Sequence, residues 1–63
     1  MNYTVKNIGK TKTNSIQYIV FDSLNIAVAV FFKDIETQLK YRIYFLEEGY
    51  TNVKDILEVI NNA

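Results

Sequence analysis

The middle of the chain, from Ile16 to Leu46, carries apolar side chains at both phases of an alternating pattern. Alternation sends successive side chains to opposite faces of a strand, so strands from this region would be apolar on both faces. The sequence predicts one short helix, at the C-terminal end, and a single helix covers one face of a small sheet. We therefore expect an uncovered apolar sheet face, and such a surface normally marks a partner or a second subunit.

The length of the chain limits how stable a monomer can be. Its 63 residues suffice for one domain, residues 1–63, with a small core. A core of this size rarely contributes more than about 3–5 kcal/mol, and small chains usually add disulfides, a metal or an oligomer partner. The sequence has no cysteine and no histidine, which excludes disulfides, thiolate metal sites and the common zinc sites. Association with a second copy or a larger molecule is the remaining means of adding stability.

The charges of the chain balance but are unevenly distributed. Seven basic residues match seven acidic ones, so no strong overall field attracts nucleic acid or a membrane. Lys6, Lys10 and Lys12 precede the first acidic residue, Asp22, whereas the charged residues from Glu47 onward are four acids and Lys54. We interpret this asymmetry as a mildly dipolar, solvated surface.

The sequence also bears on localisation. The first six residues have neither the basic start nor the apolar core of a signal peptide. The longest unbroken apolar run, Ile26–Phe32, has seven residues and is too short to span a bilayer. We therefore predict a cytoplasmic protein with no membrane partner. The frequent use of Asn, Ile and Lys suggests an AT-rich genome, such as that of a low-GC bacterium or its phages.

The pattern of apolar, turn and capping residues predicts an α+β fold in ββββα order, with a mainly antiparallel four-stranded sheet and one C-terminal helix packed on one face. The predicted strands cover residues 3–8, 15–21, 25–32 and 38–46. Thr51 or Asn52 can cap the helix, in which Val53, Ile56, Leu57 and Ile60 form an apolar stripe.

Residues 33–46 are ambiguous between strand and helix. Ile35, Leu39 and Ile43 match a helical spacing. The later residues of the segment are strand-forming, and a helix here would place Glu47 and Glu48 at the negative end of its dipole. We favour a strand, preceded by a hairpin loop.

Strand alternation then predicts which side chains lie on each face of the sheet. The residues expected beneath the helix are Tyr18, Val28, Val30, Tyr41 and Ile43. The residues expected on the uncovered face are Ile19, Phe21, Phe31, Tyr44 and Leu46.

No motif indicates catalysis. Gly9-Lys10-Thr11 resembles the end of a phosphate-binding loop, but the loop requires a glycine where this chain has Thr4. General base catalysis most often uses histidine, which is absent. Acidic residues near the loops, Asp34 and Glu36 among them, are typical of solvated surface. We expect no enzyme activity, no cofactor and no metal.

The segment Lys40–Phe45 combines basic and aromatic residues on one predicted strand. Tyr, Phe and Arg are enriched at protein interfaces, and the same residue types on an exposed sheet stack single-stranded bases. A plain edge strand, with long side chains lying over apolar neighbours, is the third interpretation. Net neutrality disfavours nucleic acid, because phosphate contacts dominate that affinity. The residues predicted to bind a protein partner are Phe21, Phe31, Lys40, Arg42, Tyr44 and Leu46.

These observations predict a non-catalytic interaction protein that binds or inhibits a larger macromolecule, with a homodimer as the expected oligomer. Its small size and AT-rich composition suggest the more specific hypothesis of an anti-defence, anti-CRISPR-like inhibitor from a phage or mobile element. This hypothesis rests on a resemblance in size and composition to such inhibitors, and not on any particular residue. The alternative is a small single-stranded nucleic-acid-binding protein that uses Lys40–Phe45.

Overall fold

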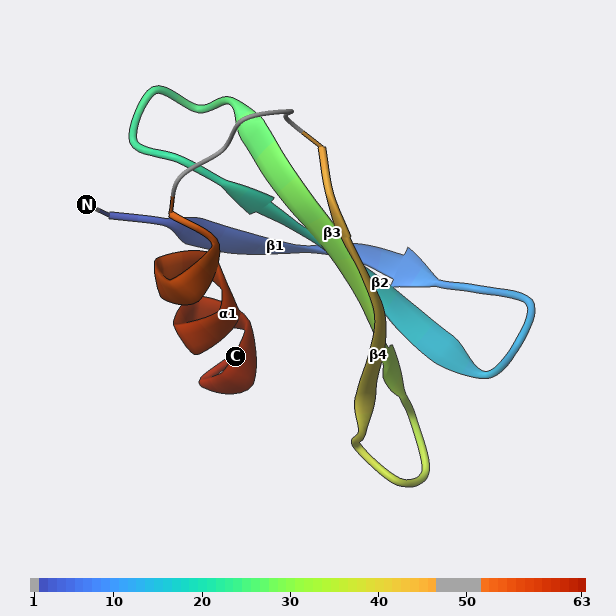
Figure 1. Cartoon of the computed structure of the whole chain (residues 1–63). Coiled ribbons are helices and arrows are strands. Elements are labelled where there is room, and N and C mark those ends of the chain that lie inside the picture. The colour runs from blue at the N-terminus through green and yellow to red at the C-terminus, as the bar shows by residue number, and fades with distance from the viewer. Residues whose placement is uncertain (1, 47–51) are drawn as a thin grey trace.

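The computed structural model describes residues 2–46 and 52–63, which form a sheet followed by a helix (Figure 1). The elements are β1 (Thr4–Lys10), β2 (Ser15–Phe21), β3 (Ala27–Asp34), β4 (Lys40–Phe45) and α1 (Val53–Asn61). The strands pair antiparallel in the order β1-β2-β3-β4, and the sheet is strongly twisted (Figure 1). The α+β class and the ββββα order predicted from the sequence are confirmed.

The strand prediction for the ambiguous segment is confirmed as well. Asp34 ends β3, and its backbone N–H donates to the carbonyl of Leu39 at the close of the turn, at 2.9 Å. β4 then pairs with β3, and no helix forms before α1 in the described part of the chain. Strand pairing along β3 therefore prevails over the helical spacing of the apolar residues.

The turn between β2 and β3 follows the chemistry expected of its residues. Both Leu24 and Ile26 donate their backbone N–H to Asp22 Oδ1, each at 2.9 Å. Asn25 takes a φ of 63°, a left-handed conformation that asparagine tolerates better than most residues. The Asp22 carboxylate thus holds the β2–β3 turn through two backbone hydrogen bonds.

Helix α1 begins after Asn52, which occupies the N-cap position, while Thr51 lies outside the described residues. The carbonyl of Asn52 accepts the N–H of Ile56 at 3.0 Å, although the Asn52 side chain makes no capping hydrogen bond. Asp55 lies in the first turn, near the positive end of the helix dipole. The predicted start of the helix is therefore correct, with Asn52 at the N-cap position as one of the two predicted candidates.

Strand pairing is irregular at Ile8 of β1 and at two further places, in β3 and β4, which decide the side chains of those two strands that share a face. Val20 pairs with Ala29 and Phe21 pairs with Ala27, so Val28 is an extra residue in β3. In β4, Arg42 and Ile43 together lie opposite Phe31 alone. Each β-bulge advances the alternation by one residue, so side chains beyond it change face.

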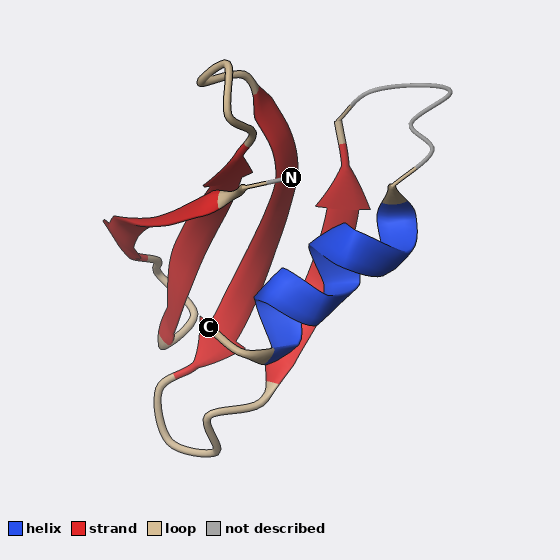
Figure 2. Cartoon of the chain, turned by 90° about the vertical axis from the view of Figure 1, so that its left-hand side faces the viewer, coloured by secondary structure: helices blue, strands red, loops and turns tan. Residues whose placement is uncertain are grey.

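The core lies between one sheet face and α1 (Figure 2). Its fully buried members are Val20, Val28, Ala29, Phe31, Ile56 and Ile60. The partly buried residues packed against them are Tyr3, Val5, Tyr18, Ile43 and Val59. The rings of Phe31 and Tyr18 stack at 5.0 Å between centroids. Of the residues predicted beneath the helix, Tyr18, Val28 and Ile43 are confirmed.

The prediction that Phe31 is exposed on the uncovered face is wrong, because its side chain is 0% exposed in this core. The placement of Val30 and Tyr41 beneath the helix is also wrong. Cross-strand pairing puts Val30 with Tyr44, and Tyr41 with Phe32, on the opposite face. The bulges account for these errors, since simple alternation assumes an unbroken register.

Candidate interaction surface

The sheet face opposite α1 carries a continuous row of paired side chains, one from each strand. Lys6 pairs with Ile19, Ile19 with Val30, and Val30 with Tyr44. Directly paired residues of antiparallel strands project to the same side of the sheet. We call this side the outer sheet face.

Aromatic residues extend this row along the strands. Phe21 pairs with Ala27 toward one end of the sheet, and Phe32 pairs with Tyr41 toward the other. The Phe32 and Tyr41 rings lie 5.9 Å apart in a tilted arrangement. The apolar and aromatic members of the outer sheet face are Ile19, Phe21, Val30, Phe32, Tyr41 and Tyr44. The described helix packs on the other side of the sheet (Figure 2), so it does not cover them.

Cations lie against the aromatic rings of this face. The Lys6 Nζ is 5.1 Å from the centroid of the Phe21 ring, and the Arg42 Cζ is 6.0 Å from that of Tyr41. Such contacts contribute about 0.5–1 kcal/mol at exposed sites. The outer sheet face therefore combines an apolar centre with positive charge near its edges.

A network of hydroxyl groups holds Tyr41 in place. The Tyr41 hydroxyl donates to Ser15 Oγ at 2.6 Å, and Ser15 is 0% exposed. The hydroxyls of Thr11 and Thr13 also hydrogen-bond Ser15 Oγ, at 2.9 and 3.2 Å. A buried polar network of this kind restricts the conformations of its members. Tyr41 is thus pre-oriented on the face, a role that alternation alone did not reveal.

The structure divides the residues that the sequence predicted to bind a partner. Phe21 and Tyr44 both lie on the outer sheet face, and Tyr44 is 55% exposed. Leu46 follows β4, is half exposed, and donates its N–H to the Val28 carbonyl at 3.0 Å. Arg42 is exposed at the β4 bulge, with a φ of 51°.

The remaining two do not share that face. Phe31 is in the core, as described above. Lys40 donates from Nζ to the Asn61 carbonyl at the end of α1, at 3.1 Å, so it lies on the helix side of the sheet. Lys40, Arg42 and Tyr44 therefore do not form the single basic and aromatic set that the strand Lys40–Phe45 predicted.

The residues that sequence reasoning missed are Val30, Phe32 and Tyr41. All three are strand-forming residues that alternation placed on the wrong side or left out of the surface. No residue type in the sequence marks their face, because it depends on the register of strand pairing.

Further observations bear on the kind of site this surface can be. Within residues 2–46 and 52–63, no group of three or more His, Cys, Asp or Glu side chains could hold a metal ion. No helix in the same residues has the length and apolar character needed to cross a membrane. Comparisons of the chain with protein-family models, curated proteins and solved structures found no match.

Proposed function

We propose that the protein is a non-catalytic binding module that docks onto a protein partner through the outer sheet face. The observation that carries the proposal is the row of Ile19, Val30 and Tyr44, which joins aromatic neighbours on a face that the described helix does not cover. Tyr and Phe are enriched at interfaces, where large rings bury much surface with little loss of side-chain freedom. Burial of each such ring yields on the order of 2 kcal/mol before ordering costs.

The charges around the face favour a particular kind of partner. Lys6 and Arg42 lie beside the aromatic rings at its edges. A complementary surface therefore has an apolar centre and acidic residues around it. We propose a larger macromolecule with such a surface, which the small chain would block. Inhibition of a host defence system is the specific form of this proposal, and its support is the composition of the chain.

Nucleic acid is the weaker alternative on geometric grounds. Lys40 is engaged with the end of α1, so the strand Lys40–Phe45 brings fewer cations to the outer sheet face than expected. Phosphate contacts supply most of the affinity for single strands, and few cations mean weak binding. The aromatic rings of the face fit an apolar protein surface equally well.

The test compares outer-face variants with a matched apolar control. Phe21→Ala and Tyr44→Ala should abolish binding of a partner isolated with the wild-type protein, measured by calorimetry with purified components. Leu24→Ala removes a similar side chain that is 78% exposed in the β2–β3 turn, and should bind as the wild type does. Unchanged affinity in both outer-face variants would refute the proposal.

Two further measurements identify the occupant. Light scattering at high micromolar concentration detects a homodimer, which should dissociate in Phe21→Ala if the outer sheet face joins the two copies. Single-stranded oligonucleotide binding that falls steeply with salt, and weakens in Arg42→Ala, would assign the surface to nucleic acid instead.

A further inference from the structure

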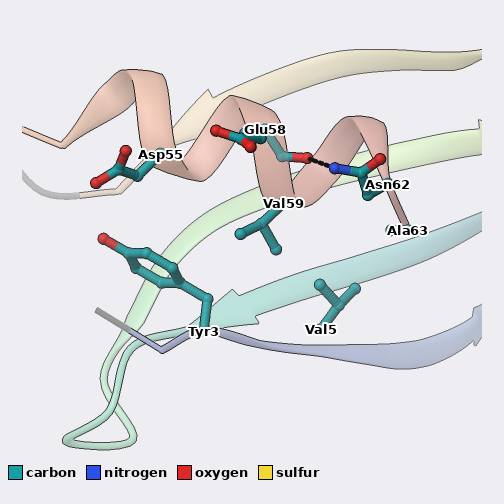
Figure 3. A pocket seen from close by; sticks show the side chains of 7 residues that line it. All are labelled: Tyr3, Val5, Asp55, Glu58, Val59, Asn62 and Ala63. Carbon is teal, nitrogen blue, oxygen red and sulfur yellow. Dashed lines mark hydrogen bonds between the residues drawn. The ribbon is translucent and has the colours of Figure 1, made fainter.

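A second surface lies on the other side of the sheet, where an open groove of about 580 Å³ separates β1 from α1 (Figure 3). Tyr3 and Val5 form the wall along β1, and the helix contributes the opposite wall. The opposite wall consists of Asp55, Glu58 and Val59 of α1, together with Asn62 and Ala63, which follow the helix. In Figure 3, Tyr3 and Val59 project into the space between the two walls.

The groove exists because one helix is narrower than a four-stranded sheet. Ile56 and Ile60 are buried in the core, and the partly buried Val59 lines the groove together with Tyr3 and with Val5 of β1. Val5 is only partly buried, although it pairs with the fully buried Val20. The inner face over β1 therefore has apolar surface that α1 leaves accessible.

The lining of the groove combines acidic and apolar side chains. Asp55 and Glu58 are exposed, and the described residues that line the groove include no lysine or arginine. Lys6 of β1 lies over Phe21 on the outer sheet face. Lys54 of α1 and Lys40, which contacts the Asn61 carbonyl, are nearer, but neither lines the groove. The field in the groove is thus complementary to a cation.

The strand beside the groove is also an edge of the sheet. β1 pairs with β2, and no described strand lies on its other side. Thr4–Asn7 keeps an unbroken register with β2 up to the irregularity at Ile8. Edge strands present backbone N–H and C=O groups to which an extended peptide can add. At the opposite edge, the bulge at Arg42 interrupts the register of β4, which disfavours strand addition there.

We propose that the β1–α1 groove binds an extended basic segment of a protein partner, which adds as a strand to the edge Thr4–Asn7. Alternate side chains of an added strand would face α1, where Lys or Arg can reach Asp55 and Glu58. The stems of these side chains would pack against the apolar surface of Val5 and Val59. This site is separate from the outer sheet face and does not depend on the function proposed for that face.

The probe is a capped hexapeptide of alternating lysine and valine, titrated into isotope-labelled protein while amide resonances are followed by NMR. The resonances of β1 and of Val59 should shift, and the affinity should fall as salt is added. Glu58→Gln should weaken binding about two- to fivefold at low salt. Glu36→Gln removes the same charge at an exposed position outside the groove, and should leave the affinity unchanged.

Two altered peptides test the two parts of the proposal. A hexapeptide with glutamate in place of lysine should not bind, because the groove would repel it. A lysine–valine peptide methylated at alternate backbone nitrogens should bind far more weakly, since it cannot complete the hydrogen bonds of an added strand. Equal binding of either peptide, or no binding of the original probe at millimolar concentration, would overturn the proposal.

Other occupants give different results. Self-association of the wild-type protein that is lost in Glu58→Gln would identify a second copy in the groove and overturn the assignment to another protein. Phe21→Ala and Tyr44→Ala should retain peptide binding. The two surfaces can therefore fail independently, and each variant reports on one of them.

Discussion

The Lys40 ammonium donates a hydrogen bond to the Asn61 carbonyl at 3.1 Å, which joins the first residue of β4 to the last residue of α1. The last carbonyls of a helix lack intrahelical partners and carry the negative end of its dipole. The last turn of α1 contains no basic residue of its own. The sheet therefore supplies the cation that this helix end favours, and the contact helps to fix where α1 lies.

Substitution of Lys40 tests this contact. Lys40→Met keeps most of the aliphatic stem but removes the charge and the hydrogen bond. We expect the free energy of unfolding to fall by about 0.5–1 kcal/mol, measured by urea denaturation. Lys12→Met removes the same charge from an exposed loop position and should change stability much less. Equal effects of the two substitutions would show that the contact with α1 adds nothing.

Phe31 and Tyr44 should respond oppositely to truncation, although the sequence predicts a partner-binding role for both. Phe31 is fully buried, and Phe31→Ala should cost about 3–5 kcal/mol, close to the entire stability of so small a domain. Tyr44 is 55% exposed, and Tyr44→Ala should cost less than about 1 kcal/mol. Amide NMR spectra should show an unfolded Phe31→Ala protein and a native Tyr44→Ala protein. A folded Phe31→Ala variant of normal stability would contradict the core described here.

The order and type of the elements could be predicted because each depends on local chemistry. Strand β2 has the predicted bounds, and the other strands begin or end one or two residues away. The turn at Asp22 and the helical stripe through Ile56 and Ile60 follow from side chains close together in the sequence. These local patterns do not depend on how the elements pack against one another.

The faces of the sheet could be predicted only in part, because they depend on register. The bulge at Val28 and the one at Arg42 and Ile43 arise from pairing between strands, and no residue type in the sequence announces them. Phe21 was nevertheless placed correctly on the outer sheet face, since β2 itself contains no extra residue and its alternation is unbroken. Phe31 lies next to the bulges, and its face was predicted wrongly.

Arg42 has a backbone conformation that costs free energy, so its replacement by glycine should stabilise the domain. Its φ of 51° lies in the left-handed region, which disfavours residues with a Cβ by about 1 kcal/mol. Arg42→Gly should raise the free energy of unfolding by up to about 1 kcal/mol. The gain is reduced by the loss of the contact between Arg42 and the Tyr41 ring. Thr4→Gly, at an exposed strand position without a positive φ, should instead lower it. Destabilisation of similar size in both variants, measured by thermal unfolding, would show that the bulge is not strained.

Asp34 should make the stability of the β3–β4 turn depend on pH. Its Oδ1 accepts the backbone N–H groups of Glu36 and Thr37, both at 2.9 Å. The bond from Thr37 is the main cause that lowers the pKa of Asp34 below its usual 3.8, against an opposing effect of desolvation. Because the pKa is lower in the folded state, the carboxylate contributes stability above its ordinary pKa and loses it as the pH falls through the folded value.

The Asp34→Asn variant tests this dependence, because asparagine retains the Oδ1 acceptor without a titrating carboxylate. The free energy of unfolding of each protein is measured with urea, from neutral pH to about pH 2. The wild-type protein should be the more stable one at neutral pH, and its advantage should shrink below about pH 4 as Asp34 becomes protonated. A difference between the two proteins that stays constant over this whole range would mean that the charge of Asp34 does not stabilise the turn.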